Sequence, residues 1–375
     1  MRVLMTGGGT AGHINPALAI ADDLRHRHPD AEFLFVGAEG RMETELVPKA
    51  GYPIRTVRVK GFQRRLTPAA LAHNVSAAFC ALTAGRTCEK ILKEFRPDIA
   101  IGTGGYVSGP ILRKAAQDGI PVIVHESNAL PGVTVKMLAK YATVCLSDES
   151  ARAYLPEGSR AVVTGNPLRK EFAALDRTEA RRALGLDARP TVLSFGGSLG
   201  AARLNEAMLY VLKESRAHGG IQHIHATGKQ GYTAFCEAMQ AQGVPLQGDG
   251  ISVRAYIDDM SRCMAAADLV ICRCGAMTLS ELPICGKPSI LVPSPYVAEN
   301  HQYHNAMVLV ERGAAICIEE KDLTGEHLWE TLLSLVSSPE TLQRMSENAR
   351  RGAITDASDR IYAVIRQVLE KRGVL

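Results

Sequence analysis

Short apolar runs alternate with longer amphipathic segments along almost the whole 375-residue chain. Each run has the length of a buried strand, and the segment after it has the apolar spacing of a helix. Strands that alternate with helices form parallel sheets with right-handed crossovers. Because the runs fall into two series, the sequence predicts two doubly wound α/β domains. The first series comprises Val3–Met5, Phe33–Val36, Ile99–Ile101, Val122–Val124, Val144–Leu146 and Ala161–Val163, and the second comprises Val192–Phe195, His223–His225, Ser252–Arg254, Leu269–Cys272, Ser289–Val292 and Ala315–Ile318.

The boundary between the domains is predicted near Gly165-Asn166-Pro167, directly after the first series. We expect an N-terminal Rossmann-like domain over residues 1–165 and a C-terminal Rossmann-like domain over residues 166–354. A helical pattern from about Asp359 to Lys371 lies in the last segment, about 355–375, which we expect to return to the first domain. Ligands bind beyond the carboxyl ends of strands in such sheets, and the glycine-rich stretches of this chain follow predicted strands.

The first glycine-rich stretch, residues 7–12, lies between a predicted strand and a predicted helix. Its glycines let an anion approach the backbone, and the helix N-terminus favours negative charge. We expect Asn15 to be the N-cap and Pro16 the first helical residue. His13 is a residue type that accepts protons near neutral pH, so it is a candidate catalytic base, with a structural role in the loop as the equal alternative.

The same stretch fits the dinucleotide fingerprint G-x-G-x-x-G. That fingerprint requires an acid at the end of the second strand, where this chain has Gly37 and where Glu39 is the nearest candidate. The stretch at 196–200 fits both a hydrolase nucleophile elbow and a phosphate-binding loop, and we favour phosphate because no downstream histidine has a supporting motif. Thr278-x-x-Glu281 fits a capping box, which competes with a role for Glu281 in binding ribose hydroxyls.

Net charge, formally +4, says little, but no acidic residue occurs between Glu45 and Glu89. This basic tract with apolar residues predicts contact with anionic lipid, while a solvated loop and helix face is the alternative. Nine scattered cysteines without a C-x-x-C pair favour a reducing compartment. No stretch reaches the ~20 apolar residues of a membrane span. The membrane-contact candidates are Arg64, Arg65, Leu71, Val75, Phe79 and Leu82.

In order along the chain, several motifs resemble the MurG family of undecaprenyl-diphospho-muramoylpentapeptide β-N-acetylglucosaminyltransferases. They are the His13 loop, GTGGYVSGP at 102–110, HESN at 125–128, GNPLR at 165–169, GGSLGA at 196–201 and GAMTLSE at 275–281. Each motif is weak alone, but the ordered set is specific and covers most of the chain. The resemblance implies a GT-B fold, with two Rossmann-like domains facing across a cleft.

The resemblance further implies that the C-terminal domain binds UDP-GlcNAc and that the N-terminal domain binds the lipid-linked muramoyl-peptide acceptor. His13 would be the base, and the protein would act at the cytoplasmic side of the bacterial cell membrane as a peripheral protein. It implies no cofactor, no metal and no nucleic acid. The chain departs from the family at Ala11, often Gly, at Cys274, usually Ser, and at His301, Gln in some members. The implied substrate contacts are Thr10, Gly12, Asn128, Arg169, Ser198, Ile257, Ala276, Met277, Glu281 and Gln302.

Two alternatives share the fold and the nucleotide. A UDP-GlcNAc 2-epimerase needs no lipid acceptor, so the acid-free tract would have no use. A non-catalytic sugar-nucleotide-binding subunit needs neither His13 nor both glycine loops. An NAD oxidoreductase is weaker than either, because the fingerprint acid is poorly placed.

Overall fold

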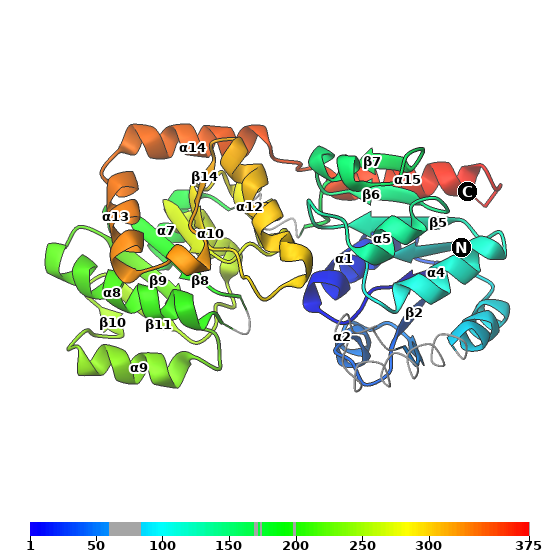
Figure 1. Ribbon diagram of the computed structural model, residues 1–375, viewed down its shortest axis with the longest axis horizontal. Coiled ribbons are helices and arrows are strands. Elements are labelled where there is room, and N and C mark those ends of the chain that lie inside the picture. The colour runs from blue at the N-terminus through cyan, green and yellow to red at the C-terminus, as the bar shows by residue number, and fades with distance from the viewer. Residues whose placement is uncertain (60–83, 169–171, 173–174, 198–199, 375) are drawn as a thin grey trace. The chain divides into compact units, whose positions relative to one another are not determined.

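The computed structural model describes residues 1–374 except 60–83, 169–171, 173–174 and 198–199. Within this part of the chain the contacts define two compact units (Figure 1). The first unit contains Met1–Leu168 and Asp356–Leu375, and the second contains Arg169–Thr355. Residues from both ends of the chain therefore build the first unit.

The first unit is a doubly wound sheet with helices on both faces. Its seven described strands are ordered β3-β2-β1-β4-β5-β6-β7, and all pairs are parallel. The strands are β1 (Arg2–Thr6), β2 (Glu32–Ala38), β3 (Ile54–Val57), β4 (Ile99–Gly102), β5 (Val122–Glu126), β6 (Thr143–Leu146) and β7 (Arg160–Val163). The helices are α1 (Ala11–Arg27), α2 (Glu43–Lys49), residues 84–95, α4 (Ser108–Gln117), α5 (Val133–Leu138), the 3-10 helix η1 (Glu149–Tyr154) and α15 (Ala357–Glu370).

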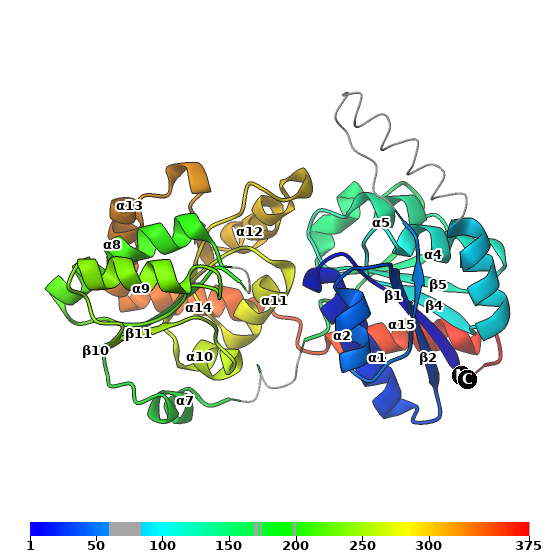
Figure 2. The ribbon, with the colours of Figure 1, turned by 90° about the horizontal axis from the view of Figure 1, so that it is seen from below.

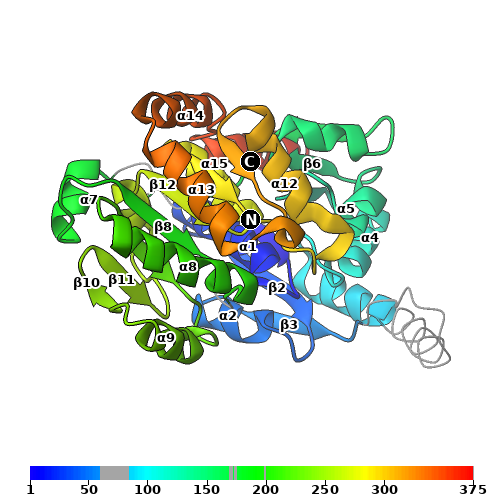
Figure 3. The ribbon, with the colours of Figure 1, turned by 60° about the vertical axis from the view of Figure 1, so that its left-hand side comes forward.

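The second unit repeats this architecture. Its seven described strands are ordered β10-β11-β9-β8-β12-β13-β14, and β10 alone pairs antiparallel. Figure 3 shows α8 and α13 near each other over the sheet, where both contribute to one apolar core. The strands are β8 (Thr191–Phe195), β9 (Gln222–Ala226), β10 (Gln247–Gly248), β11 (Ile251–Arg254), β12 (Leu269–Cys272), β13 (Ser289–Leu291) and β14 (Ala315–Cys317). The helices are α7 (Arg177–Ala183), α8 (Ala202–His218), α9 (Tyr232–Ala241), α10 (Met260–Ala266), α11 (Ala276–Cys285), η2 (Ala298–Asn300), α12 (His301–Glu311), η3 (Glu320–Asp322), α13 (Gly325–Val336) and α14 (Pro339–Arg351).

Both predicted series of strands are confirmed. They are recognisable because a parallel sheet is covered on both faces, so its strands are continuous apolar runs. In β1, for example, Val3, Leu4 and Met5 are fully buried. Two short strands were missed, β3 and β10. Both lie at sheet edges, where exposed polar residues interrupt the apolar pattern.

The predicted start of the first helix was wrong. Helix α1 begins at Ala11 with Thr10 as its N-cap, five positions before Pro16. Proline is tolerated in a first turn, but it has no N–H to donate to the carbonyl four residues earlier. The carbonyl of Gly12 therefore receives no helical hydrogen bond from Pro16. The consequence is that His13 lies inside the helix rather than in a loop before it.

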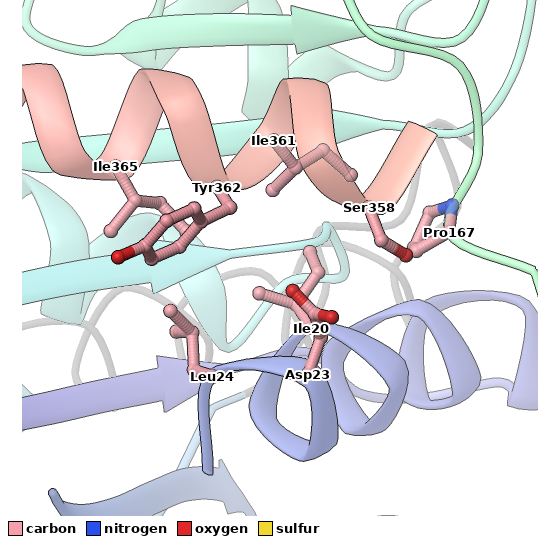
Figure 4. Close-up of a pocket in the computed structure, with 8 residues that line it drawn as sticks. All are labelled: Ile20, Asp23, Leu24, Pro167, Ser358, Ile361, Tyr362 and Ile365. Carbon is pink, nitrogen blue, oxygen red and sulfur yellow. The ribbon is translucent and has the colours of Figure 1, made fainter. Parts of the chain in front are cut away.

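Helix α15 packs against α1 in the first unit (Figure 2). Its apolar side chains Ile361, Ile365 and Leu369 join the core of the first sheet. Arg27 also pairs with Asp359 at 2.5 Å, and His28 Nε2 lies 2.9 Å from the Tyr362 hydroxyl. A small hollow of about 10 Å³ lies along this junction (Figure 4). It is smaller than the ~300 Å³ at which ligand sites begin, so we interpret it as a packing seam.

Candidate functional site

The candidate residues of the first unit lie where the strand order of the first sheet reverses. Strand β1 lies between β2 and β4, so the loops that follow β1 and β4 leave the same edge of the sheet side by side. Such a switch point is where doubly wound folds bind ligands. The two loops are in contact, because Gly8 N–H donates to the carbonyl of Gly104 at 3.4 Å. The structure thus brings together the first two glycine-rich motifs.

His13 is held between these loops in a defined orientation. Its ring Nδ1 lies 3.0 Å from the carbonyl oxygen of Thr103, and the Thr103 hydroxyl donates to the carbonyl of His13 at 2.6 Å. A carbonyl oxygen only accepts, so Nδ1 carries the proton and Nε2 is the basic nitrogen of the neutral ring. The ring is half-buried. This arrangement can take a proton from a bound hydroxyl group.

Two glycines after β4 allow this approach. A Cβ on Gly104 would lie 2.6 Å from His13 Nδ1, and a Cβ on Gly105 would lie 2.3 Å from the carbonyl oxygen of Gly8. Both residues also have positive φ, at 107° and 87°, which side chains disfavour. The glycines of the 102–110 motif therefore place the histidine, whatever ligand binds beside it.

A buried acid that the sequence analysis missed supports the first loop. Glu43, the first residue of α2, is fully buried and accepts hydrogen bonds from the N–H groups of Gly9 and Ala38, both at 2.9 Å. The sequence contains one indication of this buried acid, the glycines at positions 8 and 37. A Cβ on either glycine would collide with the Glu43 side chain.

Asn128 follows β5, on the same edge of the first sheet. Its backbone N–H and its side-chain Nδ2 both donate to Glu126 Oε1, at 2.9 and 3.0 Å, and Gly132 N–H donates to Glu126 Oε2 at 2.9 Å. Burial raises the pKa of Glu126, while these donors oppose the shift. His125 is also buried and packs as a neutral residue with its pKa lowered to about 4 by desolvation. The HESN motif therefore forms a fixed turn that orients the Asn128 amide.

The second unit carries the remaining described candidates around the start of α11. This helix begins at Ala276 directly after Gly275, so the N–H groups of Ala276 and Met277 lie in its first turn, where helices bind anions. The capping-box interpretation of Thr278 and Glu281 was wrong, because the N-cap is Gly275 and Thr278 already lies inside the helix. Glu281 is half-buried in the second turn.

Gln302 connects two loops of the second sheet. Its side-chain Oε1 accepts from the N–H groups of Ser294 at 2.9 Å and Cys274 at 3.3 Å, while Asn305 Nδ2 donates to the carbonyl of Cys274 at 3.3 Å. Helix α12 reaches this position through a turn in which Glu299 and Asn300 have φ of 53° and 52°, uncommon values for residues other than glycine. The Gln302 Nε2 group, which only donates, is the part suited to a ligand oxygen.

Other candidates are placed as follows. Thr10 and Gly12 are exposed at the start of α1, beside His13. Ile257 is buried in the core of the second unit, between β11 and α10. His223 and His225 are buried packing residues, hydrogen bonded to Ser215 and Ser194. The candidates that lie outside the described residues are Arg64, Arg65, Leu71, Val75, Phe79, Leu82, Arg169 and Ser198.

No group of three or more His, Cys, Asp or Glu side chains in this part of the chain could hold a metal ion. Nor does any helix in these residues have the length and apolar character to cross a membrane.

These two doubly wound sheets, with glycine-rich loops at their carboxyl edges, are those of a GT-B glycosyltransferase, and comparison with known proteins supports this class. Residues 3–147 match the N-terminal domain model of glycosyltransferase family 28, and residues 191–361 match the C-terminal domain model of the same family.

Relatives with closely similar sequences narrow the family further. A protein of Acetivibrio thermocellus named UDP-N-acetylglucosamine–N-acetylmuramyl-(pentapeptide) pyrophosphoryl-undecaprenol N-acetylglucosamine transferase is 43% identical, with 100% of both chains covered. A protein of the same name from Desulforudis audaxviator is 42% identical, with 99% of both covered. The crystal structure of Acinetobacter baumannii MurG has a TM-score of 0.80 and 29% identity, covering 98% of this chain and 99% of its own. This chain belongs to the MurG family of glycosyltransferases.

Proposed function

We propose that this enzyme transfers N-acetylglucosamine from UDP-GlcNAc to the 4-hydroxyl of a lipid-linked N-acetylmuramoyl-pentapeptide, the step of peptidoglycan synthesis that completes the disaccharide unit. The names and full-length similarity of its relatives support the two substrates. The observation in this chain that carries the chemistry is His13, whose Nδ1 faces the Thr103 carbonyl. That contact leaves Nε2 as the basic nitrogen.

In the proposed reaction, the acceptor oxygen attacks the anomeric carbon from the side opposite the leaving UDP, so the configuration inverts. An alcohol becomes a strong nucleophile only as its proton is removed, and His13 Nε2 takes that proton as the C–O bond forms. The imidazolium that results is stabilised by its Nδ1–H bond to the Thr103 carbonyl, which orients the ring throughout. General-base catalysis of this kind contributes about 10²–10⁴-fold.

The leaving diphosphate gains negative charge in the transition state. We assign its stabilisation to the second unit, where the N-termini of α8 and α11 lie at the carboxyl edge of the sheet after β8 and β12. Backbone N–H groups at such positions stabilise charge without reorganisation. Ser198 and Arg169 are proposed beside the diphosphate, the Ile257 backbone at the uracil, Glu281 at the ribose, and Asn128, Ala276, Met277 and Gln302 at the sugar, with Thr10 and Gly12 near the transferred group.

A transfer assay tests the proposal directly. Purified enzyme, radiolabelled UDP-GlcNAc and a lipid-linked muramoyl-pentapeptide are expected to give labelled lipid that carries the disaccharide. A parallel sample without acceptor tests for UDP-N-acetylmannosamine, the product of a 2-epimerase. A putative UDP-GlcNAc 2-epimerase of Listeria monocytogenes shares this fold at a TM-score of 0.69, but its 16% identity supports the fold alone. Epimerised product without labelled lipid would overturn the proposal.

We further propose that the first unit contacts anionic lipid at the cytoplasmic side of the cell membrane, because the acceptor is lipid-linked. Support comes from a surface on and after α5, here called the α5 surface. Its members Val133, Met137 and Tyr141 recur every four residues and are 48%, 58% and 41% exposed. Lys136 and Lys140 lie among them, with their ammonium groups near the rings of Tyr154 and Tyr141. Exposed apolar side chains beside lysines are typical of surfaces that bind membrane interfaces.

A further inference from the structure

Glu43 is a buried carboxyl group beneath the loop after β1, close to His13 in the sequence-distant first helix. It is fully buried, and its two oxygens accept from two different segments: Oε2 from Gly9 N–H in the loop after β1, and Oε1 from Ala38 N–H at the end of β2. A buried carboxyl group is costly unless donors satisfy it. The two main-chain donors, each at 2.9 Å, provide this compensation.

The space that Glu43 occupies is reserved for it by glycines. A Cβ on Gly8 would lie 2.2 Å from Glu43 Oε1, and a Cβ on Gly37 would lie 2.6 Å from its Cγ. Gly9 has φ of 85°, so the loop at the hydrogen-bonded peptide adopts a conformation that side chains disfavour. Two glycines and one turn that requires a third glycine therefore surround this single side chain.

Only three residues separate the Gly9 peptide from His13. The N–H groups of His13 and Ile14 both donate to the carbonyl of Thr10, so the hydrogen bonds of the first turn of α1 connect this loop to His13. Gly8 N–H contacts Gly104 on the other side of the loop. Glu43 therefore holds the loop after β1 through Gly9. The neighbouring Gly8 of the same loop contacts the loop after β4, which contains the Thr103 carbonyl beside the His13 ring.

We propose that Glu43 is a positioning residue for the transfer reaction, which acts through the Gly9 and Ala38 N–H groups to hold the loop that carries His13. It does not touch the substrate. This inference rests on the proposed role of His13 as the base. It also accounts for the unmatched dinucleotide fingerprint, because the Gly9 N–H that would face a pyrophosphate already bonds to a carboxyl group of the protein itself.

The test compares Glu43→Gln and Glu43→Asp with the wild-type enzyme. Glutamine retains the shape of the side chain but presents an NH₂ group to one of the two N–H donors. Aspartate retains the carboxyl group but is shorter by one methylene, which moves the oxygens away from both donors. Glu39→Gln is the matched control, because Glu39 lies on the same segment but its side chain is exposed and pairs with Arg58. The transfer assay gives kcat and the KM of each substrate, and thermal unfolding measures the folded fraction of each protein.

Both Glu43 variants are expected to lower kcat per folded molecule roughly 10- to 100-fold, since a misplacement of about 1 Å costs about that much. The KM for UDP-GlcNAc is expected to stay within about twofold, and Glu39→Gln is expected to match wild type. A purely structural role would lower the unfolding temperature and leave kcat per folded molecule unchanged, and that result would overturn the inference. If Glu43→Gln does not fold, Glu43→Asp decides alone. Wild-type turnover in the same assay tests the proposed function separately.

Discussion

The Nδ1 atom of His13 lies 3.0 Å from the carbonyl oxygen of Thr103, a main-chain acceptor on the strand-end loop beside its own. Catalytic histidines need a group that fixes their tautomer and orientation. For His13, the proposed base, this group is a main-chain carbonyl rather than a carboxylate, so the sheet itself holds it in place. Substitution of the Thr103 side chain therefore cannot remove this carbonyl group. We expect mutation of His13 and mutation of Thr103 to have very different effects on catalysis.

Replacement of His13 by alanine is expected to lower kcat about 10²–10⁴-fold, because the acceptor hydroxyl loses its base. UDP-GlcNAc affinity, measured by calorimetry, is expected to be unchanged, because the proposed nucleotide contacts lie in the second unit. His26→Ala is the matched control, since His26 is exposed near the other end of the same helix. Full turnover by His13→Ala would remove this residue from the base role.

Replacement of Thr103 by valine is expected to affect stability more than catalysis. The variant loses the hydroxyl that donates to the His13 carbonyl at 2.6 Å, at a cost of about 1 kcal/mol in the free energy of unfolding. The Thr103 carbonyl remains, so kcat is expected to fall less than about tenfold. Urea unfolding and the transfer assay measure the two effects, and Thr103→Ser should restore both. A loss of about 100-fold in kcat with an intact fold would show that the hydroxyl itself takes part.

Gln302 permits a separation of ligand binding from loop support. Gln302→Glu retains an acceptor for the N–H groups of Ser294 and Cys274 but removes the Nε2 donor. If Nε2 bonds to the donor sugar, this variant raises the KM for UDP-GlcNAc about 10-fold or more, with little change in unfolding temperature. Gln302→Ala is expected to raise the KM and also to destabilise the second unit. His301→Gln, at the neighbouring position, is the control. An unchanged KM in Gln302→Glu would limit this residue to loop support.

Apolar periodicity was sufficient to predict the two sheets, because buried parallel strands leave long apolar runs. It could not locate the edge strands β3 and β10, whose side chains are largely exposed. The predicted start of the first helix is too late because a proline before a helical pattern is typical of a first helical residue, whereas Pro16 lies inside α1. The helix continues through this position without one hydrogen bond, the one that an N–H at residue 16 would donate to the Gly12 carbonyl. A proline alone therefore does not show which turn of a helix it occupies.

For the site, glycine-rich loops after strands indicated His13 and the 102–110 motif, and the structure brings them together at a switch point. Glu43 was missed because its importance comes from three segments that meet only in the fold. Its carboxyl group accepts hydrogen bonds from the N–H groups of Gly9 and Ala38. The indication closest to it in the sequence was Gly37, whose position leaves room for the Glu43 side chain. Distances along the sequence contain little information about such a contact.

The α5 surface gives a prediction for membrane binding. Lys136→Glu/Lys140→Glu is expected to reduce flotation with vesicles that contain anionic lipid, since each lysine near such a surface contributes about 1 kcal/mol. Met137→Glu is expected to reduce flotation with neutral vesicles as well, because it removes the most exposed of the apolar side chains in this surface. Lys213→Glu/Lys371→Glu makes the same charge change at exposed lysines elsewhere and is the control. Flotation equal to wild type in both α5 variants would contradict this surface.

Two buried histidines are expected to make the stability of the second unit depend on pH. His223 and His225 are fully enclosed on β9, and desolvation lowers the pKa of each to about 3. Each hydrogen bonds through one nitrogen, to Ser215 or Ser194, while the other buried nitrogen has no partner among the described residues. A proton added there would be buried without a compensating acceptor, so both rings remain neutral in the folded unit.

The pKa values of these histidines in the folded unit, about 3, lie below the ordinary value of 6.5. Between these two pH values the unfolded chain therefore binds more protons than the folded unit. Stability is therefore complete above about pH 6.5 and falls as the pH is lowered, by about 1.4 kcal/mol per pH unit for each histidine. Fluorescence of Trp329, the one tryptophan of the chain, reports urea unfolding of this unit. His225→Gln is expected to reduce the slope by about one proton, whereas replacement of the exposed His327 by glutamine is not. An equal slope in His225→Gln and wild type would show that this ring is not a source of the acid sensitivity.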